Sequence, residues 1–248
     1  MTRYNPFTLE GKTILVTGAS SGIGREVAIE ASRLGAQIVA TGRDENRLTE
    51  TKQNASGQGH ISIVADLTCD EDIDRLVGEM PEVDGFVCNA GISHRVPITF
   101  MKREDLQRVF DTNVFASMLL TRSLMKNKKV RKNGSLVFVS SRAVHDNTPG
   151  NSIYAASKAA IECFAHGCAV EFASRKIRSN AILPGMVETP LIRRNGLLTD
   201  EDINKDKERY LLKRYGFPNE VAWLVLFLLS DAAAWITRKS FEIDGGVV

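Results

Sequence analysis

Short runs of apolar residues recur along the chain, and segments with helical spacing separate them. The runs are rich in Val, Ile and Phe and do not alternate with polar residues, a pattern typical of strands that are buried on both faces of a parallel sheet. We expect about seven strands, at residues 12–16, 37–41, 61–65, 85–88, 136–139, 178–183 and 240–243.

Between the strands, apolar residues spaced three or four apart predict amphipathic helices. Val27 belongs to the apolar face of the first helix, and Gly35 stands where a left-handed cap would end it. Thr68 and Glu71 form a capping-box pattern that predicts another helix start. From residue 104 we expect one continuous helix whose inward face holds Leu106, Val109, Phe110, Val114 and Met118.

Strands that alternate with helices predict a parallel, doubly wound α/β sheet of the Rossmann type, flanked by helices. The 248 residues, 43% hydrophobic and 25% charged, suffice for one substantial core. We therefore expect a single domain over residues 1–248, with a cofactor-binding half at about 10–130 and a catalytic and substrate-binding half at about 131–248.

Several classes of protein are disfavoured by the sequence. Residues 1–10 are polar and lack the apolar region of a signal peptide, and the longest apolar run, 221–229, is too short to cross a bilayer. The four cysteines have no CxxC spacing and are scattered among apolar neighbours, so we interpret them as buried, reduced thiols in a cytoplasmic protein. We expect neither membrane association nor a metal site.

The net charge of +2 gives no reason to expect a polyanionic partner. One basic cluster precedes the strand at 136–139 and consists of Lys126, Lys128, Lys129, Arg131 and Lys132. No aromatic residues stand among these charges, so we interpret the cluster as the solvated end of a helix with its following loop. We do not expect nucleic-acid binding.

The first strand leads directly into a glycine-rich turn that reads Thr17-Gly-Ala-Ser-Ser-Gly-Ile-Gly24. Glycines here let the backbone turn tightly and let a pyrophosphate approach the amides of the helix N-terminus. A flexible loop could carry the same residues, but a strand before the turn and an amphipathic helix after it indicate a dinucleotide site.

The second strand ends in Gly42 and Arg43, where a site specific for NAD usually presents an acidic side chain to the ribose. A guanidinium favours the 2′-phosphate of NADP instead. We therefore expect NADP(H) rather than NAD(H). The alternative is that Arg43, next to Asp44, is only a solvated surface charge.

Ser141 follows the strand at 136–139 and so lies at the carboxyl edge of the sheet, where open α/β sheets bind ligands. Tyr154 and Lys158 stand four apart in an Ala-rich helical segment, so their side chains share one face. An ammonium about 4 Å from the phenol would lower its pKa from about 10 by about three units. This trio predicts proton transfer at an oxygen; the alternative is an ordinary surface helix.

Asn113 lies within the apolar stripe of the helix that starts near residue 104. A buried amide without hydrogen bonds costs about 1–3 kcal/mol, so it must have partners. The residues alone leave open whether it ties the helix to a backbone segment or takes part in catalysis.

In this order, the motifs closely resemble the compact form of the short-chain dehydrogenase/reductase family, over nearly the whole chain. The resemblance rests on the glycine turn, Asp66, Asn89-Ala-Gly91, Asn113, Ser141, Tyr154-Ala-Ala-Ser-Lys158, Pro184-Gly185 and Asp244-Gly-Gly246. It implies that Tyr154 is the acid/base and that Lys158 tunes it and holds the nicotinamide ribose. It also implies that Ser141 orients the substrate oxygen and that Asn113 anchors a proton-relay water. The implied cofactor contacts are Gly18, Ser20, Ser21, Gly22, Ile23, Arg43, Asp66, Leu67, Asn89, Ala90, Gly91, Tyr154, Lys158, Pro184, Gly185, Val187 and Thr189.

Two residues depart from the family pattern. Cys88 stands where asparagine is common before Asn-Ala-Gly, and Arg238 where glycine is common after Ile-Thr. We expect the first to alter a turn contact and the second to alter the C-terminal loop. Neither departure removes a residue that the chemistry requires.

The resemblance implies an NADP(H)-dependent oxidoreductase that interconverts a secondary alcohol and a ketone. Within the same class, the alternative is a 3-oxoacyl carrier-protein reductase whose basic cluster docks the carrier. Outside it, the alternative is a silent NADP-binding scaffold or sensor, which would be expected to lack one of the four catalytic residues. The substrate is a small molecule, and its specificity is expected to lie in His94, Arg95 and residues 142–151 and 186–213, whose charges hint at a polar or anionic compound.

The resemblance further implies a homo-oligomer, with a tetramer favoured. Small residues on the helix of Tyr154 permit close approach by another helix, and apolar residues on the preceding helix lie off its inward stripe. These residues are Ala155, Ala156, Ala159, Ala160, Phe115 and Leu119.

Overall fold

The structure is a computed structural model that describes residues 5–190 and 199–247. Within them, one parallel sheet of seven strands has the order β3-β2-β1-β4-β5-β6-β7, which confirms the predicted fold class. The strands are β1 Thr13–Thr17, β2 Gln37–Gly42, β3 Ile61–Val64, β4 Val83–Cys88, β5 Val130–Val139, β6 Arg178–Pro184 and β7 Ser240–Ile243. Only β5 differs much from expectation, because it begins at Val130 and its register against β4 shifts between Val83 and Gly85.

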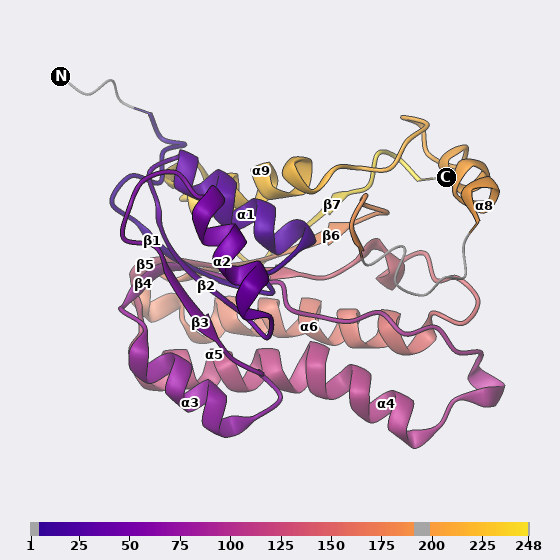
Figure 1. The fold of residues 1–248 in the computed structure, drawn as a ribbon, viewed down its shortest axis with the longest axis horizontal. Helices are drawn as coiled ribbons and strands as arrows, with labels where there is room; N and C mark the ends of the chain where they lie inside the picture. Colours follow the sequence, from indigo (N-terminus) through magenta and orange to yellow (C-terminus); the bar gives the residue numbers. More distant parts are fainter. Residues whose placement is uncertain (1–4, 191–198, 248) are drawn as a thin grey trace.

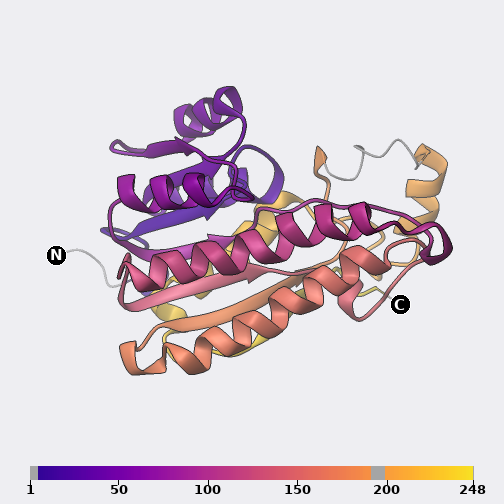
Figure 2. The same cartoon turned by 90° about the horizontal axis from the view of Figure 1, so that it is seen from below.

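Helices cover both faces of the sheet (Figures 1 and 2). One face carries α1 Gly22–Arg33, α2 Glu45–Asn54 and α9 Pro218–Leu229. The other carries α3 Asp70–Glu79, α5 Ala116–Lys126 and α6 Ser152–Glu171, with α4 Arg103–Phe110 extending outward ahead of α5. A short helix, α8 Asp200–Lys207, lies near the C-terminus.

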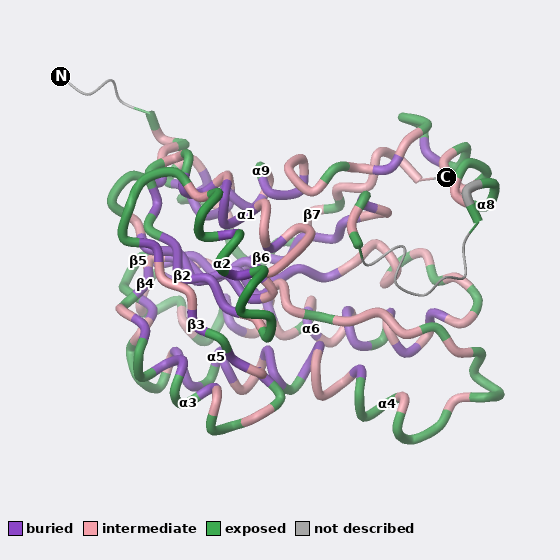
Figure 3. The backbone as a smooth tube through the Cα atoms, in the orientation of Figure 1, coloured by how far each residue is buried: buried purple, intermediate pink, exposed green. Residues whose placement is uncertain are grey.

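Successive strand residues point to opposite faces, so both faces need apolar side chains. Phe86 and Phe138 pack toward α3, α5 and α6, whereas Val87 and Val137 pack toward α1 and α9. All four are fully buried; β1 is buried along its whole length, and β4 and β5 over most of theirs (Figure 3). This two-sided burial explains why the strands appear in the sequence as continuous apolar runs.

Of the two helix ends predicted from the sequence, one is confirmed and one is wrong. Gly35 has a φ of +90° and its amide donates to Ser32, which confirms the left-handed cap after α1. The capping box at Thr68 is wrong, because α3 begins only at Asp70 and the Thr68 hydroxyl donates to Asp66 at 2.8 Å. Acidic residues fill the first turn of α3, where they complement the helix dipole without a capping side chain.

The continuous helix expected from residue 104 is interrupted. A π-helical segment, Asp111–Phe115, separates α4 from α5, and its wider turn changes which residues face inward. Val109 and Val114 are buried as predicted, but Leu106 is 40% exposed, so its placement on the inward face is wrong. Phe115 is 51% exposed, in keeping with its expected position off that face.

The basic cluster lies at the amino end of β5, at the opposite edge of the sheet from Ser141. Part of it is engaged: Lys129 donates to the Met80 carbonyl at 2.6 Å, and Arg131 pairs with Asp84 at 2.8 Å. The interpretation of a merely solvated cluster therefore holds only in part.

The four cysteines are free thiols. Cys88 and Cys168 are buried, but Cys163 is exposed and Cys69 intermediate, so the expectation of four buried thiols is wrong for two of them. Cys163 is exposed because it lies on the outward side of α6. In the parts of the chain that the structure describes, no helix has the length and apolar character to span a bilayer.

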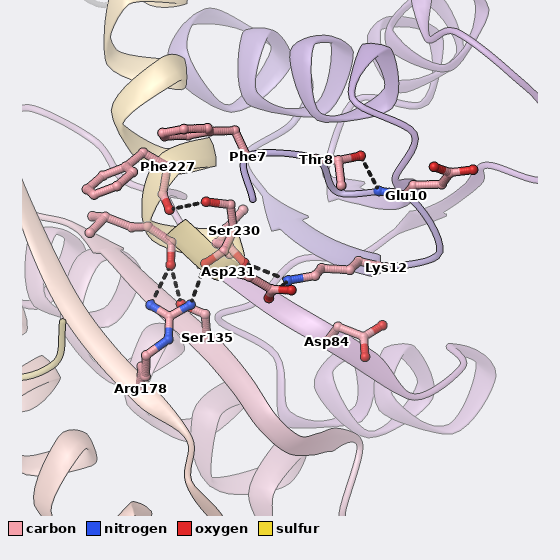
Figure 4. Close-up of polar contacts among 12 residues, drawn as sticks. Phe7, Thr8, Glu10, Lys12, Asp84, Ser135, Arg178, Phe227, Ser230 and Asp231 are labelled. Atoms are coloured by element: carbon pink, nitrogen blue, oxygen red, sulfur yellow. Dashed lines mark hydrogen bonds and ion pairs between the residues drawn. The ribbon is translucent and has the colours of Figure 1, made fainter. Parts of the chain in front are cut away.

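The amino edge of the sheet also holds the C-terminus of α9 in a dense polar network (Figure 4). Arg178 donates to the carbonyls of Leu228 at 2.7 Å and Ser230 at 3.1 Å. The Ser135 hydroxyl donates to Leu228 at 2.8 Å, and Lys12 donates to Leu229 at 3.3 Å. The last carbonyls of a helix lack partners within the helix, and here side chains supply them.

Candidate active site

The turns that follow β1 and β4 are locked together at the carboxyl edge of the sheet. The Thr17 hydroxyl accepts hydrogen bonds from the amides of Asn89 at 2.9 Å and Ala90 at 3.1 Å. The Asn89 side chain donates back to the Thr17 carbonyl at 3.0 Å. The glycine turn and the Asn-Ala-Gly segment therefore form one rigid floor.

The glycine turn fits a dinucleotide. Gly18 has a φ of +65°, and a Cβ there would lie 2.9 Å from the Asn89 side chain, so only glycine suits the position. Helix α1 begins at Gly22, and the side chain of its N-cap, Ser21, makes no capping hydrogen bond. The first amides of α1 therefore remain available to an anion, beside a cavity of about 460 Å³.

Two arginines line that cavity at the end of β2. Arg43, predicted from the sequence, lies 3.8 Å from Asp66. Arg47, one turn into α2, was not predicted. Asp44 caps α2, since its carboxylate accepts from the Arg47 amide at 3.0 Å and also pairs with the Arg47 guanidinium at 3.4 Å. A cation four residues after Arg43, on a helix that Asp44 starts, is the signal that could have revealed Arg47.

Ser141, Tyr154 and Lys158 lie together on the wall of a second cavity of about 580 Å³. Lys158 is only 5% exposed and donates to the Val139 carbonyl at 2.8 Å. Its ammonium lies 5.8 Å from the centre of the Tyr154 ring. The hydroxyl of Ser141 accepts a hydrogen bond from the Ala143 amide at 3.2 Å, and it lies close enough to Tyr154 to influence the pKa of the phenol.

Burial governs the protonation of these groups. It raises the pKa of Tyr154, with the Ser141 hydrogen bond acting in the opposite direction. It lowers the pKa of Lys158 to about 8. The expected lowering of the phenol pKa is therefore not found, because desolvation of the phenolate dominates. The phenol is thus firmly protonated at neutral pH, and removing a proton from the ammonium is much easier than in water.

Asn113 lies behind this cavity rather than on its wall. It is 1% exposed, and its oxygen accepts from the Ile92 amide at 2.8 Å. Its nitrogen donates to the Ile92 carbonyl and to the Ser157 hydroxyl, both at 3.0 Å. The backbone tie that the sequence left open as one alternative is present.

The two cavities adjoin, since Ile23, Asn89, Gly91 and Thr189 line both. All other residues expected to contact the cofactor line one or the other: Gly18, Ser20, Ser21, Gly22, Arg43, Asp66, Leu67 and Ala90 at the smaller, and Tyr154, Lys158, Pro184, Gly185 and Val187 at the larger. Together they form a continuous space along the carboxyl ends of the strands, at the place where doubly wound sheets bind ligands.

The wall of the larger cavity away from β5 is charged. One face of α8 and the turn after it contributes Asp202, Lys205, Asp206 and Arg209. Arg209 pairs with Asp146 at 3.1 Å and Asp206 at 3.2 Å. Arg95 and parts of 142–151 and 186–213 line the cavity as expected, whereas residues 191–198 of the last stretch lie outside the described residues. The expectation for His94 is wrong, because its ring hydrogen-bonds with Asp105 at 2.7 Å and is not part of the cavity wall.

Comparisons with known proteins agree with this geometry. The family model described as enoyl-(acyl carrier protein) reductase matches residues 18–248. The chain is 32% identical to a 3-oxoacyl-(acyl-carrier-protein) reductase of Rickettsia felis, over 97% of this chain and 98% of that protein. It is 36% identical to an L-xylulose reductase of Caenorhabditis elegans, over 95% of both. A crystal structure of a short-chain type dehydrogenase/reductase from Mycobacterium marinum superposes with a TM-score of 0.87 at 30% identity, over 97% of this chain and 96% of that one.

Fold and relatives together define an oxidoreductase that acts on carbonyl or alcohol groups. The chain belongs to the short-chain dehydrogenase/reductase family. Its relatives imply a nicotinamide cofactor, and the glycine turn, with its open helix N-terminus, provides a cradle for one.

Proposed function

We propose that the protein is an NADP(H)-dependent oxidoreductase that interconverts a secondary alcohol and a ketone. The observation that carries the proposal is the position of Tyr154, on the same cavity wall as Ser141 and beside the buried Lys158, in a cavity that continues into the cradle at the glycine turn. Residues of about 10–130 would hold the cofactor and those of about 131–248 the catalytic groups and substrate, in one domain.

When bound, the nicotinamide supplies or accepts hydride. In the reducing direction Ser141 holds the carbonyl oxygen, and Tyr154 donates its proton to that oxygen. The high pKa of the phenol keeps the proton on Tyr154 until charge develops on the substrate. Lys158 then stabilises the phenolate, and Asn113 keeps the surrounding segments in register. The pyrophosphate would be held at the glycine turn by Gly18, Ser20, Ser21 and Gly22.

The turnover test is Tyr154→Phe, measured with a ketone and NADPH. Turnover should be lost while NADPH still binds, because only the proton donor is removed. Turnover at the few-per-cent level or above would contradict the mechanism. A wild-type protein that binds NADPH but reduces nothing would favour a silent sensor or scaffold.

The preference for NADP rests on Arg43 and Arg47 at the cavity and on Asp44 being engaged as a helix cap. A charge-assisted hydrogen bond to the 2′-phosphate contributes about 1.5–3 kcal/mol, equivalent to a roughly ten- to hundredfold preference. NADPH and NADH are titrated by fluorescence into the wild type, Arg43→Ala and Lys52→Ala. Lys52 is an exposed cation on α2, the helix that follows Arg43, and does not line the cavity.

We expect Arg43→Ala to remove most of the preference and Lys52→Ala to keep it. Equal affinity of the wild type for NADPH and NADH would mean that Arg43 is only a surface charge. An equal loss of preference in both variants would mean that the net positive charge of this region, not a contact, sets the preference.

The 3-oxoacyl carrier-protein reductase stays the second candidate because such reductases are among the relatives. The basic cluster gives it no support, since it lies at the sheet edge opposite the cavity. A screen of ketones, sugars and acyl thioesters, followed by NADPH absorbance, separates the two. Faster turnover of the carrier-bound thioester than of the free thioester would favour the second candidate.

We also propose a homo-oligomer, with a tetramer favoured. The supporting features are the exposed apolar side chain of Phe115 and the small residues of α6, of which Ala156 is exposed. Light scattering across a dilution series tests it. A monomer mass with full activity at micromolar protein would contradict the proposal.

A further inference from the structure

Ser157 links two residues of the proposed catalytic set. It lies in the first turns of α6 and is completely buried, with 0% of its surface exposed. Its hydroxyl donates to the Tyr154 carbonyl at 2.7 Å and accepts from the Asn113 side chain at 3.0 Å. Both hydrogen bonds lie away from the cavity, so Ser157 does not touch the reacting atoms.

The first of these bonds is ordinary, because a serine in a helix often bonds back to a carbonyl of the preceding turn. The second is not local, since Asn113 belongs to the π-helical segment Asp111–Phe115. The side-chain amide of Asn113 has two hydrogens, and it donates one to the Ile92 carbonyl and the other to the Ser157 hydroxyl. A series of hydrogen bonds thus connects Ile92, in the segment after β4, through Asn113 and Ser157 to Tyr154 on α6.

Close packing makes this series of hydrogen bonds sensitive to small shifts. A Cβ built on Gly91 would lie 3.1 Å from the Asn113 oxygen and 3.3 Å from the Lys158 nitrogen. The floor of the cofactor cradle, the π-helical segment and the first turns of α6 therefore meet at one point without spare room. A loosened bond between Asn113 and Ser157 would let α6 move relative to that floor.

We propose that Ser157 is a positioning residue that fixes the Tyr154 hydroxyl relative to the cofactor floor through Asn113. The proposal rests on the proposed function of Tyr154 as proton donor. Turnover requires a geometry that a displacement of about 1 Å can impair by up to about a hundredfold. Binding of the cofactor and substrate requires less exact placement.

The test is Ser157→Ala, which removes the hydroxyl without adding bulk. We expect kcat to fall about tenfold, whereas KM for the ketone and the Kd of NADPH stay within about twofold. A kcat within twofold of the wild type would overturn the proposal, and so would a loss confined to KM or to NADPH binding.

Ser179→Ala is the matched control. Ser179 is also completely buried, and its hydroxyl donates at 2.7 Å to a carbonyl of the same helix, that of Ala165, far from the cavity. Both variants should lower Tm to a similar extent, but Ser179→Ala should keep its kcat. An equal fall of kcat in both variants would show a general effect of lost stability and would overturn the proposal.

A double-mutant cycle with Asn113→Ala tests the route. If Ser157 acts through Asn113, the double variant should be no more than about threefold slower than Asn113→Ala alone. Losses that multiply would overturn the proposed route. A wild-type protein that reduces no ketone, or a Tyr154→Phe variant that stays active, would instead refute the proposed function and is seen before Ser157 is changed.

Discussion

Two cations, the partly buried Arg178 and the buried Lys158, lie at opposite ends of the strands and are held in different ways. Arg178, at the amino edge, donates to two carbonyls at the end of α9 and lies near the charge of Asp231 (Figure 4). Lys158, at the carboxyl edge, donates to one carbonyl within the described residues, although an ammonium has three donors. The first cation completes a helix end and belongs to the scaffold. Lys158 retains N–H donors for a ligand bound in the adjoining cavity, which is the arrangement expected of a ligand site.

The largest expected difference between the two cations is in turnover. Lys158→Met should lower kcat by about 10²–10⁴-fold, because the phenolate of Tyr154 then forms without a neighbouring positive charge. NADPH binding should weaken as well if Lys158 also holds the ribose. Stopped-flow and steady-state kinetics with NADPH measure both effects, and a fall in kcat of less than tenfold would place Lys158 with the scaffold residues.

The same substitution should have an unusual effect on stability. Burial lowers the pKa of Lys158 to about 8 in the folded state, from 10.5. Between these values the unfolded chain holds the proton and the folded protein does not, so this group raises stability as pH rises from 8 to 10.5, by about 3 kcal/mol in all. At pH 7 the buried charge opposes folding, and Lys158→Met should be the more stable protein.

Urea unfolding of both proteins at pH 7 and pH 10 checks this. The advantage of Lys158→Met should shrink as pH rises, and titrations of other groups largely cancel in the difference. An advantage that is constant with pH would mean that Lys158 titrates as it does in water.

Arg178→Met should lower stability and leave kcat nearly unchanged, the opposite of what we expect for Lys158→Met. Loss of the guanidinium leaves the Ser230 carbonyl without this donor, and we expect unfolding to become easier by about 2 kcal/mol. The kcat should stay within twofold of the wild type, since the change lies at the other edge of the sheet. Denaturant melts and kinetics on the same preparation test it, and a marked loss of kcat would show that the two edges are coupled.

The smallest expected effect concerns Arg238, the departure from glycine at the C-terminal loop. Its φ is +58°, a left-handed conformation that non-glycine residues adopt at a penalty. Arg238→Gly should raise stability by about 0.5 kcal/mol, after the greater flexibility of glycine in the unfolded chain is subtracted. Arg238→Ala is the control, because alanine removes the charge but shares the strain. An equal gain in both variants would point to charge rather than to backbone conformation.

The sequence predicted the sheet well because two-sided burial leaves a direct pattern, as in Phe86 with Val87 and Phe138 with Val137. It also predicted that the turns after the strands lie together, because the carboxyl ends of parallel strands lie at the same side of the sheet. It did not reveal the π-helical segment, since no residue type marks a widened turn and the apolar residues Phe110 and Val114, four apart, also suit an α-helix. Ser157 was missed for another reason, because its partner Asn113 is brought to it by tertiary packing.

The pKa of Tyr154 was predicted in the wrong direction because the spacing of Tyr154 and Lys158 indicates a neighbouring charge but not the degree of burial. Desolvation depends on what surrounds the ring, and those neighbours come from distant parts of the chain. Asp44 is a similar case: beside Arg43 it is an ambiguous acid, and only the start of α2 shows that it serves as a cap.

The widened turn at Asp111–Phe115 also limits how the length of this chain can vary in evolution. A π-helical turn holds about one residue more than an α-helical turn, so it keeps the helices on either side nearly in phase despite the extra residue. Deleting one residue within the segment would give a normal α-helical turn and leave Val109 in the core, whereas deleting one residue within α5 would rotate the helix before it by about 100°. The fold should therefore tolerate a change of length at this segment and not within α5, although activity would still require Asn113 to meet Ser157.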